Sequence, residues 1–187
     1  MTLRETVERF HPGCEQEAQD RRLMLSYIDR FPDLLTRENE LAHFTASAWV
    51  VNPARDRVLM LYHNIYKSWA WPGGHADGDA DLMGVALREV QEETGAAALR
   101  PASADPLSLE ILPVAAHFRR GRYVAPHLHL NLTYLLVAQE DQVLRAKPDE
   151  NSGVAWFALN EAVAASTEPD MRVIYEKLNG RLRAKGD

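Results

Sequence analysis

Glu89, Glu92 and Glu93 are the residues whose type and spacing most directly suggest chemistry. On an α-helix, spacings of three and four place Glu92 and Glu93 on the same side as Glu89, one turn along. Like charges so placed cost an isolated helix roughly 0.2–0.5 kcal/mol per pair, so some compensation is expected. Solvent or a neighbouring base such as Arg88 is one source. A bound divalent cation is the other, because clustered carboxylate oxygens suit Mg²⁺ or Mn²⁺.

A helix from about Leu82 to Thr94 must carry these carboxylates. Asp81 is suited to be its N-cap, and Gly95 sits where a helix commonly ends. Most of an apolar side is supplied by Leu82, Val85, Ala86, Leu87 and Val90. The pattern therefore predicts an amphipathic helix that is packed on one side and acidic on another.

The stretch Gly74–Ala96, which contains the run REVQEETGA, resembles the Nudix box, usually written GX5EX7REUXEEXGU with U an aliphatic residue. It departs from the box at Ala80, where the family has its first glutamate. In the family that glutamate supports the loop and the box arginine and is not a principal metal ligand. Asp79 or Asp81, on either side of Ala80, could substitute for it. The departure therefore concerns the loop more than the metal site.

The resemblance implies an enzyme that cleaves a diphosphate linked to another moiety, such as a nucleotide or a nucleotide sugar, by attack of water. It implies that Glu93 and Glu89 hold the essential Mg²⁺ or Mn²⁺, with Glu92 shared between ions or orienting a water. A carbonyl of the glycine loop, assigned here to Gly73, would complete the metal site. A base or additional ligand usually comes from a later loop, and Glu150 is the residue we select. The alternative for Glu150 is an exposed loop acid.

Substrate contacts are less clearly marked in the sequence. Tyr62 and Trp71 are aromatic residues before or within the glycine loop, and either could stack on a base or ring. Arg119 stands in a basic loop and could contact phosphate. The alternatives are core packing for the aromatic residues and a solvated side chain for Arg119. The expected partner is a small-molecule diphosphate substrate, whose leaving moiety the sequence does not identify.

Four histidines suggest a second site, because their positions resemble the metal-binding positions of type I isopentenyl diphosphate isomerase, a relative of the Nudix fold. His43 precedes a Ser-x-Trp strand, His75 follows a glycine, and His127 and His129 stand where that family has two acids. Such a cluster would bind either a second metal of borderline type, such as Zn²⁺, Mn²⁺ or Fe²⁺, or a phosphate group of the substrate. The alternative is that these histidines form no site, being either exposed to solvent or satisfied by hydrogen bonds within the protein. Isomerase activity itself is not expected, because the isomerase's catalytic cysteine would fall at Gly73.

The remaining pattern predicts an α/β fold. Runs of β-formers bounded by turn residues predict strands at 44–51, 57–63, 111–118, 127–137 and 153–159, with a polar loop over 119–126. Along 127–131, His127, His129 and Asn131 alternate with leucines and should share one face. Helical spacing predicts helices over 15–31 and 169–182. The resemblance implies that these elements form a Nudix α/β/α sandwich with a mixed β-sheet.

Two segments are expected, an N-terminal helical extension over 1–40 and a Nudix hydrolase domain over 41–187. The extension is interpreted as packing against the domain, because its apolar residues recur at helical spacing. A dimer contact or a substrate lid is the alternative, which leaves a homodimer open as a partner arrangement.

Bulk properties exclude several classes of protein. The net charge of −6 and pI near 5.6 argue against a protein that binds a nucleic-acid backbone. No apolar run approaches the roughly 20 residues of a membrane span, and no signal-peptide core is visible. The single cysteine, Cys14, fits a reducing compartment, so a cytoplasmic location is expected.

A domain that binds a diphosphate ligand without cleaving it, as a sensor or interaction module, is the alternative function. Ala80 could mark such a domain. The three retained acids argue against it, because a pure binder need not keep a carboxylate cluster at an electrostatic cost.

Overall fold

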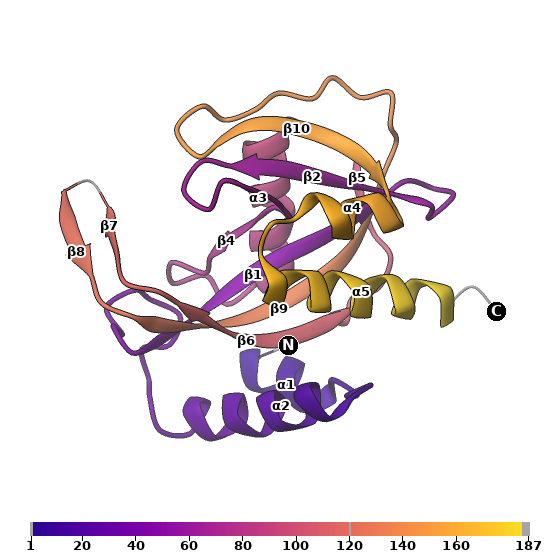
Figure 1. Ribbon diagram of the computed structural model, residues 1–187. Coiled ribbons are helices and arrows are strands. Elements are labelled where there is room, and N and C mark those ends of the chain that lie inside the picture. Colours follow the sequence, from indigo (N-terminus) through magenta and orange to yellow (C-terminus); the bar gives the residue numbers. More distant parts are fainter. Residues whose placement is uncertain (1, 120, 185–187) are drawn as a thin grey trace.

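The computed structural model describes residues 2–119 and 121–184 (Figure 1). Among these residues the helices are α1 Leu3–Arg9, α2 Glu15–Ile28, α3 Leu82–Thr94, α4 Leu159–Ala165 and α5 Pro169–Ala184. No helix in this part of the chain has both the length and the apolar character needed to cross a membrane.

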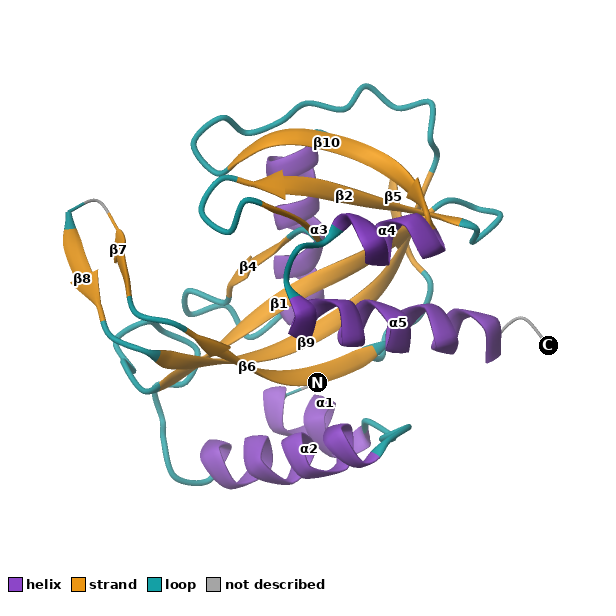
Figure 2. Ribbon diagram, in the orientation of Figure 1, coloured by secondary structure: helices purple, strands orange, loops and turns teal. Residues whose placement is uncertain are grey.

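One mixed sheet forms the centre of the fold (Figure 2). Its central path runs β10-β2-β1-β9-β5, with β3 paired to β2, β4 to β1 and β6 to β9. Strands β1 and β9 are parallel, and the other pairs are antiparallel. The strands of this sheet are β1 Ala42–Val51, β2 Arg57–His63, β3 Ser68–Ala70, β4 Gly73–His75, β5 Leu99–Pro101, β6 Ser108–Val114, β9 His127–Ala138 and β10 Asn151–Ala158.

Helices cover both faces of this sheet, with α3 on one side and α4 and α5 on the other (Figures 1 and 2). Strand β1 buries apolar side chains on both faces of the sheet, because successive side chains of a strand point to opposite faces. Phe44 and Ala46 belong to the core that α3 closes, whereas Trp49 and Val51 belong to the core that contains Tyr175 of α5. The predicted mixed α/β/α sandwich is therefore confirmed.

Helix α3 has the predicted bounds. The Asp81 carboxylate accepts a hydrogen bond from the Gly84 backbone N–H at 3.1 Å, which caps the first turn. Gly95 follows the last residue with φ of 75° and donates its N–H to the Gln91 carbonyl. That left-handed conformation favours glycine, so the helix ends where the sequence indicates.

The N-terminal segment is less helical than predicted. Helix α2 ends at Ile28 and not at Phe31, because the residue before Pro32 avoids the helical conformation and the chain turns earlier. Between α2 and β1 the chain forms turns, and Leu34 of this stretch is buried in the core. Met24 of α2 is fully buried as well, so the segment packs against the sheet.

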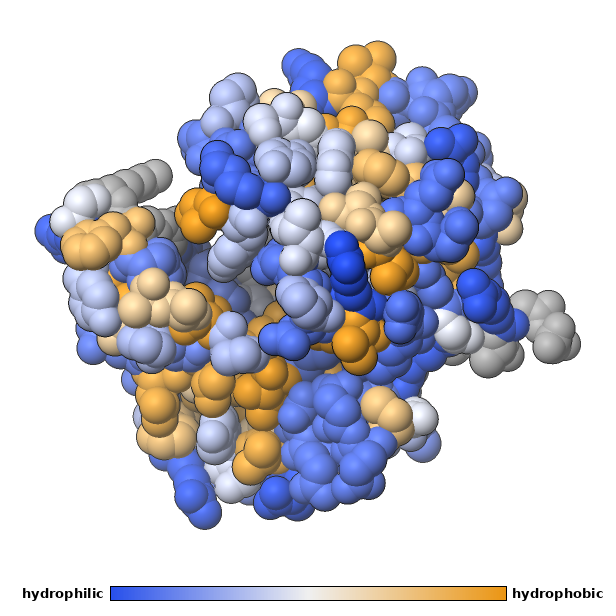
Figure 3. All heavy atoms as spheres, viewed as in Figure 1, coloured by the Kyte–Doolittle hydropathy of each residue, from blue (hydrophilic) through white to orange (hydrophobic). Residues whose placement is uncertain are grey.

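Strand β6 ends at Val114, so the prediction of one strand over 111–118 was wrong, as was that of a loop over 119–126. Strands β7 His117–Arg119 and β8 Arg122–Val124 instead form a separate hairpin. Gly121, with φ of 78°, supplies its turn. Phe118 and Tyr123 are 73% and 63% exposed, so the hairpin lacks the burial pattern that marks a strand. The surface is hollowed beside it (Figure 3).

Candidate active site

Strand β4 brings the helix carboxylates against the glycine loop. The Gly73 backbone N–H donates to Glu93 Oε2 at 2.9 Å. A Cβ placed on Gly74 would lie 2.4 Å from Glu89 Cδ, so only glycine lets the backbone approach this carboxylate. Two of the three predicted acids, Glu89 and Glu93, therefore contact the glycine loop that precedes α3 in the sequence.

Burial sets the electrostatics of these acids. Glu93 is only 5% exposed, and burial raises its pKa to about 8, with the nearby Glu89 and Glu150 adding to the shift and the Gly73 N–H opposing it. Burial also raises the pKa of Glu89, to which Glu92 and Glu150 contribute. A site that gathers several carboxylates around the buried Glu93 favours a positive charge among them.

Glu92 and Glu150 are connected by a base. Lys147 Nζ lies 3.5 Å from Glu92 Oε2 and 3.0 Å from Glu150 Oε2. The turn that carries Glu150 is tied to α3, because the Asn151 side chain donates to the Glu93 carbonyl at 2.9 Å. Glu150 therefore faces the acids of α3. Lys147 was not predicted as a site residue, although a base three residues before Glu150 can reach it across the intervening turn.

Of the two acids beside Ala80, Asp79 is the one that contacts Arg88. Arg88 Nη1 lies 3.3 Å from Asp79 Oδ2, so the loop is tied to α3 through this pair. Asp81, the other acid beside Ala80, caps the helix instead. The box arginine thus has a carboxylate partner despite the departure at Ala80.

The predicted substrate contacts fall in three different environments. Trp71 is only 9% exposed and packs edge-on against Tyr175 at 5.4 Å between ring centroids, which is a core position and does not favour stacking on a substrate. Tyr62 is half-buried and contacts the Trp69 ring at 5.6 Å. The backbone of Arg119 pairs with Arg122 in the β7–β8 hairpin, and its side chain lies outside the described part of the structure.

The four histidines meet at the start of β1 and β9. In the parallel pairing of these strands His43 is the partner of His129, and His75 of β4 is the partner of Thr45 on β1. Nitrogens of His43, His75 and His129 all lie within 4.8 Å of one another. His127 joins them, because its Nε2 lies 3.2 Å from Nε2 of His129.

Burial and the neighbouring imidazoles disfavour protonation of His43 and His129. Burial lowers the pKa of His129 to about 2, and the neighbouring His75, His43 and His127 lower it further in that direction. Burial likewise lowers the pKa of His43, against a hydrogen bond to Asn39 that raises it.

Strand β4 separates the two clusters. Because side chains of a strand alternate, Gly74 and His75 face opposite sides of the sheet. The Gly74 side is filled by the Glu89 carboxylate, and the His75 side belongs to the face shared with His43. One short strand therefore contributes to a carboxylate cluster and to an imidazole cluster.

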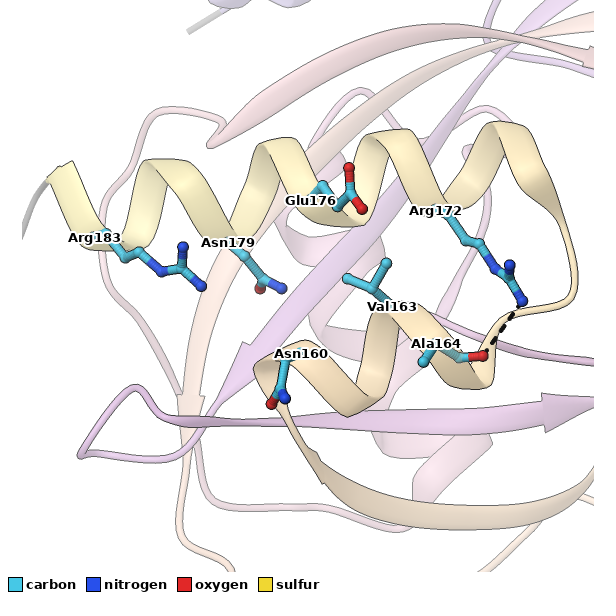
Figure 4. A pocket seen from close by; sticks show the side chains of 7 residues that line it. All are labelled: Asn160, Val163, Ala164, Arg172, Glu176, Asn179 and Arg183. Carbon is cyan, nitrogen blue, oxygen red and sulfur yellow. Dashed lines mark hydrogen bonds between the residues drawn. The ribbon is translucent and has the colours of Figure 1, made fainter.

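A further hollow lies between α4 and α5 (Figure 4). It contains none of the residues predicted for the site, and its lining consists of Asn160, Val163, Ala164, Arg172, Glu176, Asn179 and Arg183. Arg172 contributes to its wall by donating to the Ala164 carbonyl at 3.4 Å. None of the acids of α3 lines this hollow, so it is not part of the carboxylate site.

The sequence of this chain matches a known protein family. The sequence model described as the NUDIX domain matches residues 41–178. A search of curated protein sequences gave no match.

Solved structures share the fold at low sequence identity. An Ap4A hydrolase from C. elegans is 20% identical, with a TM-score of 0.56 over 75% of this chain and 98% of that chain. The E. coli dihydroneopterin triphosphate pyrophosphohydrolase is 16% identical, with a TM-score of 0.54 over 72% of this chain and 92% of that chain. A NUDIX-family hydrolase from Clostridium perfringens is 18% identical, with a TM-score of 0.53 over 75% of this chain and 97% of that chain.

Proposed function

The chain belongs to the Nudix family, and we propose that it is a pyrophosphohydrolase that uses Mg²⁺ or Mn²⁺ to hydrolyse a small-molecule diphosphate linked to another moiety, such as a nucleotide or a nucleotide sugar. The observation that carries the proposal is the contact between β4 and α3. There Gly73 donates to Glu93 and Gly74 leaves room for the Glu89 carboxylate.

The residues at this contact fit a hard divalent cation. They offer carboxylate oxygens, and the buried Glu93 holds a raised pKa that a neighbouring positive charge would relieve. We assign Glu89 and Glu93 as principal ligands, Glu92 as a shared or water-orienting acid, and the Gly73 carbonyl as a further ligand. A divalent cation held there would neutralise phosphate charge and lower the pKa of the attacking water.

Glu150 is proposed as the proton acceptor. In the reaction a water oxygen bonds to phosphorus, the phosphoanhydride bond to the leaving phosphate or moiety breaks, and the water proton passes to the Glu150 carboxylate. Lys147, at 3.0 Å from Glu150 and 3.5 Å from Glu92, is proposed to hold both acids in position. Glu150 also contributes to the raised pKa of Glu89, which supports its placement at the site.

Substrate recognition is proposed to involve the half-buried Tyr62 of β2, because β2 pairs with β10, which begins directly after Glu150. Arg119 remains a proposed phosphate contact from the hairpin. The named activities of the solved neighbours, on Ap4A and on dihydroneopterin triphosphate, both concern phosphoanhydrides and set the range of compounds to test.

The test is product release from a panel of nucleoside triphosphates, nucleotide sugars, dinucleoside polyphosphates and isoprenoid diphosphates, with Mg²⁺ or Mn²⁺. Glu93→Gln, which keeps the side-chain shape and removes the charge, is the paired variant. Turnover of one class that Glu93→Gln reduces would support the proposal. Turnover that is equal in both proteins would refute the assignment of this site. Absence of turnover across the panel would count against a substrate of these classes.

A further inference from the structure

We propose that His43, His75, His127 and His129 form a transition-metal centre for a borderline divalent cation such as Zn²⁺, on the face of β4 opposite the carboxylate cluster. The proposal is independent of the hydrolytic function, because none of these four residues is assigned to it. Imidazole nitrogens suit Zn²⁺ and related ions, whereas Mg²⁺ prefers oxygen ligands.

His43 presents an unused lone pair to the cluster. Its Nδ1 lies 3.1 Å from the Asn39 carbonyl, and because a carbonyl only accepts, Nδ1 carries the proton. Its Nε2 is therefore the unprotonated nitrogen of a neutral ring. His43 is only 4% exposed, and within the described residues this Nε2 has no hydrogen-bond partner. A buried polar atom without a partner is costly, and a bound cation would satisfy it.

His127 is oriented in the same way. Its Nδ1 lies 2.9 Å from the Ala125 carbonyl, which again directs the lone pair of Nε2 toward the cluster. Histidines that bind metals commonly donate their other ring N–H to a backbone carbonyl, which fixes the tautomer and the ring orientation. Two of the four rings therefore already have the outer hydrogen bond of a metal ligand.

One pair of nitrogens already has the spacing of a tetrahedral site, and the others lie near it. Two nitrogens bound to one Zn²⁺ at about 2.0–2.1 Å lie roughly 3.3 Å apart. His127 Nε2 and His129 Nε2 are 3.2 Å apart, and the nitrogens of His43, His75 and His129 are within 4.8 Å of one another. Sheet pairing fixes the backbones of β1, β4 and β9. Rotation of the imidazole rings about their side-chain bonds would therefore be the movement that closes the remaining gaps.

A phosphate group is a poorer occupant of this cluster. An anion needs donors, whereas His43 and His127 both turn an accepting lone pair inward. The same lone pairs are what a cation requires. The geometry thus favours a metal over the phosphate contact that the sequence left open.

The experiment separates this centre from the carboxylate site. Glu89→Gln/Glu93→Gln removes two of the acids, and this chelator-treated double variant is titrated with Co²⁺ and, by calorimetry, with Zn²⁺. We expect one Co²⁺ per chain with the visible absorption of a four-coordinate nitrogen site. Adding His75→Gln or His129→Gln should weaken Co²⁺ binding by more than about tenfold. His11→Gln, at an exposed histidine far along the chain from the cluster, is the matched control and should bind normally.

Circular dichroism establishes that each variant is folded. If His129→Gln unfolds, His75→Gln at the half-buried end of β4 carries the test alone. Absence of Co²⁺ binding to the double variant would overturn the proposal. So would Co²⁺ binding that a folded His75→Gln variant leaves unchanged, or thermal stabilisation by inorganic phosphate that is lost in that variant.

Discussion

At the scale of single residues, Glu93 combines burial with a raised pKa. A carboxyl group whose pKa rises on folding contributes stability that is present below its ordinary value of 4.5 and is lost as the pH rises to about 8. The metal-free protein should therefore become less stable across this interval, because the unfolded chain ionises Glu93 more readily.

This prediction is checked by urea unfolding of the chelator-treated protein at both ends of that interval. Glu93→Gln should lose less stability than the wild type as the pH rises, since it has no carboxyl group to titrate. Equal pH dependence in the two proteins would show that the Glu93 environment does not penalise its charge.

Asp79 is the acid beside Ala80 for which we propose a supporting role in the altered box. Because it is the acid that reaches Arg88, Asp79→Asn should loosen the loop and lower kcat several-fold. Ala80→Glu restores the family's acid and should leave activity intact or raise it, and it should rescue Asp79→Asn when the two are combined. Steady-state kinetics of the three variants tests this. A large loss from Ala80→Glu alone would mean that the loop uses a different geometry.

At the scale of elements, β4 is the structure that aligns α3 with the loop. Gly74→Ala would place a Cβ 2.4 Å from Glu89 Cδ, so this side chain must move. We expect a loss of more than about tenfold in kcat/KM, since misplacement of a ligand removes transition-state stabilisation.

Gly180→Ala is the control for this substitution, because a Cβ there has open space within α5. It should preserve activity and stabilise the helix by about 0.5–1 kcal/mol. Retention of full activity in Gly74→Ala would show that the close approach of β4 to Glu89 is not required.

Elements with local signals were predicted closely from the sequence. Helix α3 has its N-cap, its apolar side and its terminal glycine within one short stretch, and its bounds were confirmed. Strand β2 was predicted with the correct bounds because its run of β-forming residues directly follows a turn. The β7–β8 hairpin was missed because its side chains are exposed, so no burial pattern distinguishes it from a loop.

Contacts between distant segments were less predictable. The alternation of His127 and His129 was visible in one strand, but their meeting with His43 depends on the parallel register of β1 and β9. Local residues do not specify that register. Lys147 was missed for a related reason, because its partner Glu92 lies on a helix far away in the sequence.

At the scale of the whole molecule, a buried ionic cluster ties the N-terminal segment to the C-terminal helix. Glu17 of α2 is fully buried and pairs with Arg181 and with Lys177, the latter at 3.2 Å. Lys177 also pairs with the buried Glu110 of β6 at 2.8 Å. We infer from these contacts that residues 1–40 are an integral part of the folded unit and not a separate lid.

Glu17→Gln should therefore lower the free energy of unfolding by about 3 kcal/mol, because it removes the buried carboxylate that pairs with the partly buried Arg181 and Lys177. Glu15→Gln is the control on the same helix, since Glu15 is exposed, and it should change stability by less than about 0.5 kcal/mol. Urea denaturation measures both. Equal, small effects would mean that the extension contributes little to the fold.

The proposed function depends on one claim, that the acids of α3 hold the cation used in hydrolysis. The most direct measurement is a Mn²⁺ titration of turnover with chelator-treated protein and the substrate found in the panel, comparing the wild type with Glu93→Gln and Glu15→Gln. We predict no turnover before Mn²⁺ is added, recovery in the wild type and in Glu15→Gln, and a rate more than about tenfold lower in Glu93→Gln at saturating Mn²⁺. Full turnover without a divalent cation, or an unchanged rate in Glu93→Gln, would contradict the claim.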